Sequence, residues 1–185
     1  MPPTPRISKD KILQASFDLI REKGVESLNA RNIAHKLECS TQPIFSVYSS
    51  MDELRKDLFE MADAYHSQYF NKIELNENYF LNLGVAYVDF ALEETNLFRL
   101  LFMSDYYAGK KLTDFIDDEN NESIVSGIPE TIGIHSDTSK KIFINMWLYA
   151  HGIASMLAMN HLQLPRDEIV SMISEVFLSL INEEI

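Results

Sequence analysis

Four side chains of one short segment carry groups that suit contact with DNA: Thr41, Gln42, Phe45 and Ser46. The amide of Gln42 can bond adenine N6 and N7 together, and Thr41 can contact a thymine methyl group in the major groove. Phe45 has no core to serve on this face, so contact with a sugar or a thymine methyl group is favoured, with packing as the alternative. A merely solvated short helix would also carry such residues, so the elements that position them matter.

The surrounding residues have the pattern of a helix-turn-helix. Asn29 can cap a first short helix, the pattern breaks at Leu37-Glu38-Cys39, and Ser40 offers its hydroxyl as the next cap. Residues spaced three or four apart form the inward faces of the two helices, Ile33, Ala34 and Leu37 in the first, Ile44 and Tyr48 in the second.

The second short helix, Thr41 to Tyr48, contains a proline. Pro43 lies in the first turn, where its missing N–H had no intrahelical acceptor, so the helix tolerates it. The four candidate side chains then point away from the helical pair and are available to a partner.

The helices on either side of this motif have well-marked ends. Ser8 can cap a helix from Lys9 to Lys23, and Gly24 ends it. Ser50 and Glu53 fit a capping box that opens a long helix. The sequence thus predicts a three-helix DNA-binding domain over residues 1–49.

Residues 50–185 have helical periodicity throughout, and no run of residues is typical of a strand. An acidic and Gly/Pro-containing stretch, 117–137, is predicted to be a surface loop. The predicted fold class is all-α. The expected helices are Ser50–Lys72, Glu77–Glu93, Asn96–Tyr107, Leu112–Ser126, Thr138–His161 and Arg166–Asn182.

The net charge of −12 is unevenly distributed along the chain. Residues 1–56 hold nine Lys or Arg against seven Asp or Glu, whereas the remainder holds seven against twenty-one. This asymmetry is typical of an N-terminal module that binds a polyanion, joined to an acidic body that a polyanion repels.

The segment Ile142–Leu162 is almost wholly apolar over 21 residues, long enough to cross a bilayer. Asn145, His151, Ser155 and Asn160 interrupt it, so we expect a helix buried on one side by its own core and on the other by a second subunit. The C-terminal helix has a similarly broad apolar face. Together they predict a homodimer interface, with no membrane partner.

Other classes of function have little support in the sequence. The five histidines lack paired metal-ligand spacing, and His151 is interpreted as a hydrogen-bonded core or interface residue. No phosphate-binding loop or nucleophile motif is present, so neither an enzyme nor a cofactor is expected. Cys39 is the only cysteine and no secretion signal is apparent, which predicts a cytoplasmic protein.

The body of the chain is rich in aromatic residues, including more Tyr hydroxyls than a plain helical core needs. An apolar pocket with a few polar groups is typical of small-molecule sites. The predicted lining residues are Tyr87, Phe102, Tyr106 and Trp147.

These motifs resemble the TetR family of bacterial repressors. The resemblance lies in Gly24, in the segment Arg31-Asn32-Ile33-Ala34-His35-Lys36-Leu37, in Ser40, in Phe45-Ser46-Val47-Tyr48 and in Ser50-Met51-Asp52-Glu53-Leu54. A weaker resemblance to a subgroup with a Trp-His-Gly signature lies in Ala86–Ala91, Trp147 and His151-Gly152. The family implies an all-helical homodimer that binds a small ligand in residues 50–185 and a palindromic operator through two recognition helices.

The chain departs from the family pattern at three positions. Phe45 stands where a phosphate-contacting tyrosine is usual, Met51 where a lysine is common, and Glu38 where a small residue is usual. Lost phosphate contacts predict modest, salt-tolerant DNA affinity. Arg6, Lys9, Arg31, Ser49 and Ser50 remain candidates for phosphate contact.

The sequence therefore predicts a ligand-responsive regulator, most simply a repressor released by a small apolar or aromatic ligand. The alternative is a degenerate helix-turn-helix protein that acts as a small-molecule carrier or binds a protein partner. The candidate DNA-contacting residues are Arg31, Ser40, Thr41, Gln42, Phe45, Ser46 and Ser50.

Overall fold

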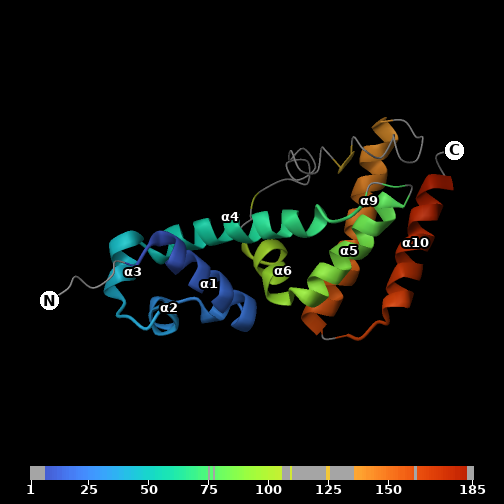
Figure 1. Cartoon of the computed structure of the whole chain (residues 1–185). Helices are drawn as coiled ribbons and strands as arrows, with labels where there is room; N and C mark the ends of the chain where they lie inside the picture. The colour runs from blue at the N-terminus through green and yellow to red at the C-terminus, as the bar shows by residue number, and fades with distance from the viewer. Residues whose placement is uncertain are drawn as a thin grey trace. The chain divides into compact units, whose positions relative to one another are not determined.

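The computed structural model describes residues 7–74, 76, 78–105, 109, 124–125, 136–160 and 162–182. Within this part of the chain the protein is all helical, as predicted (Figure 1). The elements are α1 (Lys9–Lys23), the 3-10 helix η1 (Val25–Ser27), α2 (Ala30–Lys36), α3 (Gln42–Val47), α4 (Met51–Phe70), α5 (Tyr79–Glu93), α6 (Thr95–Phe102), α9 (Ser136–Asn160) and α10 (Arg166–Asn182).

The predicted helices agree with most of these bounds. The bounds of α1 and α10 are those expected, and the other assigned helices differ from prediction by a few residues at one or both ends, most at the end of α6. The expected helix Leu112–Ser126 and the surface loop 117–137 lie almost wholly outside the described residues.

Contacts divide the chain into two compact units. The N-terminal unit comprises Met1–His66 and Glu94–Ser104, and the C-terminal unit comprises Ser67–Glu93 and Asp105–Ile185. The packing division therefore differs from the predicted domains, because α6 is grouped with the helix-turn-helix. The assignment of DNA binding to residues 1–49 and of ligand binding and dimerisation to 50–185 stays a prediction.

The N-terminal unit is built around α1, which contacts η1, α2 and α6. Gly24 ends α1 with a φ of +80°, a conformation that favours glycine, and its N–H donates to the carbonyl of Ile20 at 2.7 Å. Ser8 and Asn29 cap α1 and α2 as expected, accepting from the N–H groups of Lys11 and Asn32. The fully buried side chains of the N-terminal unit include Ile12, Ile20, Ile33, Ile44, Leu54, Leu97 and Phe98.

The turn between α2 and α3 contains a strained residue. Glu38 has a φ of +51°, in the left-handed region where a Cβ atom is unfavourable. This gives a physical reason for the small residue that is usual in the family at this position.

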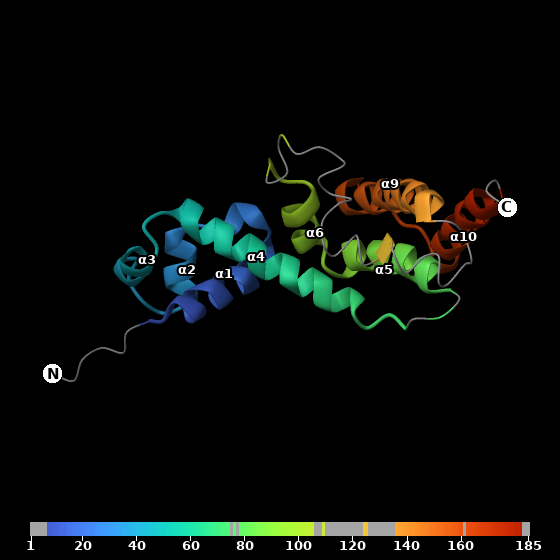
Figure 2. The same ribbon diagram turned by 90° about the horizontal axis from the view of Figure 1, so that it is seen from above.

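In the C-terminal unit, α9 and α10 both pack on α5 (Figure 2). The ring of Phe80 lies 6.4 Å from that of Phe143 in α9 and 5.7 Å from that of Phe177 in α10. Gly84 permits a close approach of α10, because a Cβ there would lie 3.2 Å from a methyl carbon of Ile173. Aliphatic and aromatic packing thus holds these three helices together.

The helix α9 is long and apolar enough to cross a membrane by length and composition alone. Residues Thr138–Met159 contain a window with a mean hydropathy of 1.4, of which 44% is buried. A core helix of a protein without a membrane span passes the same test, and α9 contacts both α5 and α10. This helix is therefore weak evidence for a membrane span.

Candidate functional site

The four residues predicted to be available to a partner lie on the side of α3 that leaves the core. Ile44 and Tyr48 are buried, as expected, whereas Gln42 and Ser46 are exposed and Thr41 is half-buried. Phe45 is 52% exposed, so its ring has no packing role comparable to that of Ile44. The predicted exposure is confirmed for Gln42, Phe45 and Ser46 and only in part for Thr41, and an apolar ring stands among polar groups on this face.

The predicted cap of α3 is wrong. The N-cap residue is Thr41 rather than Ser40, and no side chain forms a cap hydrogen bond there. Thr41 already has helical φ and ψ angles, although α3 is assigned from Gln42 onward. Ser40 is exposed, and its hydroxyl is not used to cap α3.

The start of α4 is held by two serines and one glutamate. The Ser50 hydroxyl accepts from the N–H of Glu53 at 3.2 Å, as the capping box predicts. The Glu53 carboxylate, however, accepts from the hydroxyl and N–H of Ser49, at 2.7 and 2.8 Å. Because these bonds favour the ionised form, they lower the pKa of Glu53. The Ser49 hydroxyl proton is therefore already committed within the protein.

Two of the basic candidates differ in how they are held. Arg31 is exposed in the first turn of α2, and no ion pair within the described ranges engages it. Lys9 is paired with Asp57 of α4, with 2.6 Å between Nζ and Oδ2. Arg6 lies outside the described residues. Of these three candidates, Arg31 is thus the one that the described structure leaves available.

A polar cluster that the sequence analysis missed joins α1, α4 and α6. Arg21 donates through Nε to the Glu94 carboxylate at 2.6 Å and through a second nitrogen to the other oxygen. The Tyr65 hydroxyl donates to the same carboxylate at 2.9 Å. Asn96 donates to the carbonyl of Arg21 at 3.0 Å. Since Arg21 and Glu94 are 73 residues apart, no local pattern signals this contact.

Two of the predicted ligand-site residues meet through His151. The Tyr87 hydroxyl and His151 Nδ1 are 2.9 Å apart, and the Trp147 ring stacks on the His151 ring at 5.2 Å between centroids and 26° between planes. Burial lowers the pKa of His151, which favours the neutral imidazole. The interpretation of His151 as a hydrogen-bonded residue agrees with this geometry.

The other two predicted ligand-site residues are not part of this group. Phe102 belongs to the N-terminal unit, where its ring lies 5.2 Å from that of His66. Tyr106 lies outside the described residues. The described structure therefore brings together Tyr87 and Trp147 alone of the four.

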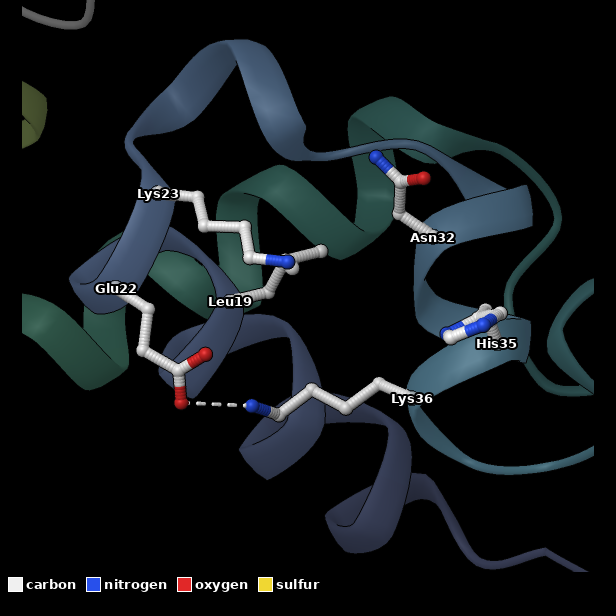
Figure 3. A pocket seen from close by; sticks show the side chains of 6 residues that line it. All are labelled: Leu19, Glu22, Lys23, Asn32, His35 and Lys36. Atoms are coloured by element: carbon white, nitrogen blue, oxygen red, sulfur yellow. Dashed lines mark hydrogen bonds and ion pairs between the residues drawn. The ribbon is translucent and has the colours of Figure 1, made fainter.

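A pocket of about 290 Å³ lies between α1 and α2 (Figure 3) and shares no residue with the predicted ligand site. All but one of its lining side chains are polar or charged, and Lys36 and Glu22 form an ion pair of 2.9 Å at its edge. Such a lining does not suit an apolar ligand. The lining residues are Leu19, Glu22, Lys23, Asn32, His35 and Lys36.

Within the described ranges, no group of three or more His, Cys, Asp or Glu side chains is placed to hold a metal ion. The geometry instead offers an exposed helical surface in the N-terminal unit and a half-buried aromatic cluster in the C-terminal unit.

A family profile described as "Tetracyclin repressor-like, C-terminal domain" matches residues 80–175, just over half of the chain. The chain belongs to the TetR family of transcriptional regulators. The matched residues include Trp147, His151 and Gly152. No curated protein matches the chain.

Solved structures share the fold of this TetR-family protein. A protein of unknown function from Rhodococcus sp. RHA1 is 21% identical, with 96% of each chain covered and a TM-score of 0.71. A TetR-like transcriptional regulator from the same organism is 14% identical over 98% of each chain, with a TM-score of 0.64. A TetR variant from Acinetobacter baumannii AYE, in complex with minocycline, is 15% identical over 96% of each chain, with a TM-score of 0.58.

Proposed function

We propose that this TetR-family regulator is a ligand-responsive repressor that binds a palindromic operator as a homodimer. The observation that carries the proposal is the exposed surface of α3 on a compact helical unit. Two such helices, about 34–36 Å apart, would enter successive major grooves on one side of the DNA.

Base reading is assigned to the exposed end of α3. Gln42 supplies an amide for adenine, and Thr41 and Phe45 supply apolar contact with thymine methyl groups or sugars. The proposed phosphate contacts are Arg31, Ser40, Ser50 and the N–H groups that begin α4. The Ser46 hydroxyl already donates to the carbonyl of Pro43 at 2.7 Å. Since Phe45 and Met51 replace two usual phosphate-contacting residues, we expect a shallow dependence of affinity on salt.

The proposed dimer interface is the outer face of α9 together with α10. Leu148, Met156, Met159 and Leu178 are between 48% and 57% exposed. Leu148, Gly152, Met156 and Met159 follow helical spacing, so they share one face of α9. A Cβ atom on Gly152 would meet nothing within 4 Å in a single chain, which leaves room for a second helix to approach. These features support association through this face.

The proposed ligand site is centred on Tyr87, Trp147 and His151, and Phe102 and Tyr106 stay predicted lining residues on the strength of the sequence. Rings with a hydroxyl and an imidazole suit a small apolar or aromatic molecule that carries one polar group. If its binding displaces α4 and separates the two recognition helices, ligand and DNA must weaken each other by the same factor.

The test is selection of bound duplexes from a random DNA pool by the full-length protein, at low and moderate salt. Enrichment of a two-fold symmetric site supports the proposal. Gln42→Ala should then lose discrimination at one base pair in each half-site. The control is Gln68→Ala, which changes an exposed glutamine near the C-terminal end of α4 and should keep that discrimination.

Recovery of unenriched DNA at both salt concentrations would contradict the proposal. It would favour the alternative, a degenerate helix-turn-helix protein that carries a small molecule or binds a protein partner, which Phe45 and Met51 support. In either case we propose a cytoplasmic protein without catalytic activity, cofactor or metal.

A further inference from the structure

A small polar network joins the first turn of α1, the end of α3 and the second turn of α4. Asp57 Oδ2 accepts from Lys9 at 2.6 Å and from the Tyr48 hydroxyl at 3.0 Å. The Lys9 ammonium also lies over the Tyr48 ring, 5.2 Å from its centroid. The Lys9 ammonium is thus held by two neighbours, the Asp57 carboxylate and the Tyr48 ring.

This network lies at the edge of the proposed DNA-reading surface. Tyr48 directly follows the last residue of α3, so the Lys9 ammonium is beside the C-terminal end of the recognition helix. The side chain of Lys9 is 53% exposed, which leaves it accessible to a phosphate. It is therefore a cation of the reading surface as well as a partner of Asp57.

Carboxylates dominate the charges around this ammonium. Glu53 and Glu60 of α4 act on Lys9 in addition to Asp57, and all three favour its charged form. The pKa of Asp57 is lowered, chiefly by its hydrogen bond from Lys9, so its carboxylate stays ionised. DNA approaching this edge would meet negatively charged carboxylates and a lysine that is already paired with one of them.

We propose that Asp57 competes with DNA phosphate for Lys9 and so limits the affinity of this regulator for DNA. The inference builds on the proposed DNA binding and assigns Asp57 as a positioning residue that acts through Lys9. An exposed ion pair of this kind changes an equilibrium constant by roughly two- to fivefold. Phosphate can therefore break the pair, at a corresponding cost in affinity.

The test is a salt titration of DNA binding by the wild-type protein and Asp57→Asn, using one duplex for both. The variant removes a carboxylate charge and keeps the side chain's shape. We expect affinity roughly two- to fivefold higher at low salt, since the competing pair is weakened. The plot of log affinity against log salt should also steepen by up to about 0.9, one additional phosphate contact.

Glu22→Gln is the matched control. Glu22 also pairs with a lysine in the N-terminal unit, at 2.9 Å from Lys36, so the control makes the same change in net charge. It lies 13 residues after Lys9 in the same helix, about 20 Å along the axis. That separation exceeds the Debye length of about 10 Å at 0.1 M salt, so little change in slope is expected.

Two further variants separate charge from structure. Asp57→Glu keeps the charge and should keep the wild-type slope, whereas a purely structural role would be disturbed by it. Adding Lys9→Gln to Asp57→Asn should remove the gain in slope. If Asp57→Asn fails to unfold cooperatively in a thermal melt, Asp57→Ser provides the same loss of charge with a smaller side chain.

The outcomes distinguish the two proposals. The role of Asp57 is overturned, and DNA binding left intact, if the wild type binds and neither Asp57→Asn nor Asp57→Ser changes the slope against salt. The same holds if Glu22→Gln changes that slope as much as the Asp57 variants do. If neither the wild type nor a folded Asp57 variant binds any duplex, both proposals are overturned. Binding that appears only in the Asp57 variant supports the competition.

Discussion

Different kinds of contact join the helices within each of the two compact units. In the N-terminal unit, caps and polar clusters such as Arg21–Glu94–Tyr65 join the helices around a fully buried apolar core. In the C-terminal unit, α5, α9 and α10 pack mainly through rings and aliphatic groups, and α9 keeps large apolar side chains exposed. The first unit thus presents a defined polar surface to a partner, whereas the second leaves an apolar face that association would cover.

The largest expected effect tests the apolar face of the C-terminal unit. Met156→Glu should weaken dimerisation at least a hundredfold, because a two-fold interface would bury the unpaired charge twice. Analytical ultracentrifugation over a concentration series measures this, and circular dichroism checks the fold. Glu26→Gln, a change at an exposed position of η1 outside both α9 and α10, is the control. A Met156→Glu protein that stays dimeric would show that the interface lies elsewhere.

The next prediction concerns a largely but not fully buried histidine of the N-terminal unit. Burial lowers the pKa of His66 from 6.5 to about 4, so the imidazole is neutral when folded. Between pH 6.5 and pH 4 the unfolded state gains a proton that the folded state does not. The free energy of unfolding should therefore fall by about 3 kcal/mol over this range, with the full contribution present above pH 6.5.

Denaturant titrations of wild type and His66→Leu across that pH range measure the effect. The variant should lack this part of the pH dependence, whatever its stability at neutral pH. Equal pH dependence in the two proteins would contradict a neutral buried His66. A proton titration of the imidazole by NMR gives an independent value.

Breaking the polar cluster should cost somewhat less. Arg21→Met leaves the buried Glu94 carboxylate without its cation, and we expect a loss of about 2 kcal/mol, less than for a fully buried pair because Arg21 is partly exposed. Lys23→Met, in the same turn of α1, should change stability by less than about 0.5 kcal/mol. Hydrogen exchange of α1 and α6 locates the effect, and equal losses in both variants would rule out a role for the ion pair.

The smallest expected effect is a gain in stability at a strained turn. Glu38→Gly should raise the free energy of unfolding by about 0.5–1 kcal/mol, since glycine adopts the left-handed φ without a Cβ clash. Glu38→Ala keeps the Cβ atom and should show no such gain. Thermal denaturation of the two variants compares them directly, and a gain for alanine as large as that for glycine would point to charge rather than strain.

Local features were predicted well from the sequence. Ser8, Asn29 and Ser50 accept the cap hydrogen bonds expected of them, and Gly24 ends α1. These contacts join residues three or four apart, so neighbouring sequence is sufficient. The prediction failed at Ser40, where the helix starts one residue later and Thr41 takes the cap position without a side-chain bond. Pro43 stands three residues after Ser40 and has no N–H, so the hydrogen bond that a cap side chain usually accepts from that position cannot form.

The sequence by itself determined the helices, their buried faces and the exposed side chains of α3, because helical periodicity and caps act over one turn. Only the tertiary structure decided which charged groups meet. It paired Lys9 with Asp57 and Arg21 with Glu94, grouped α6 with α1, and placed His151 between Tyr87 and Trp147. These partners lie 48 or more residues apart except within α9, and a charged or aromatic side chain carries no signal of which distant residue will meet it. Packing of the helices makes that choice.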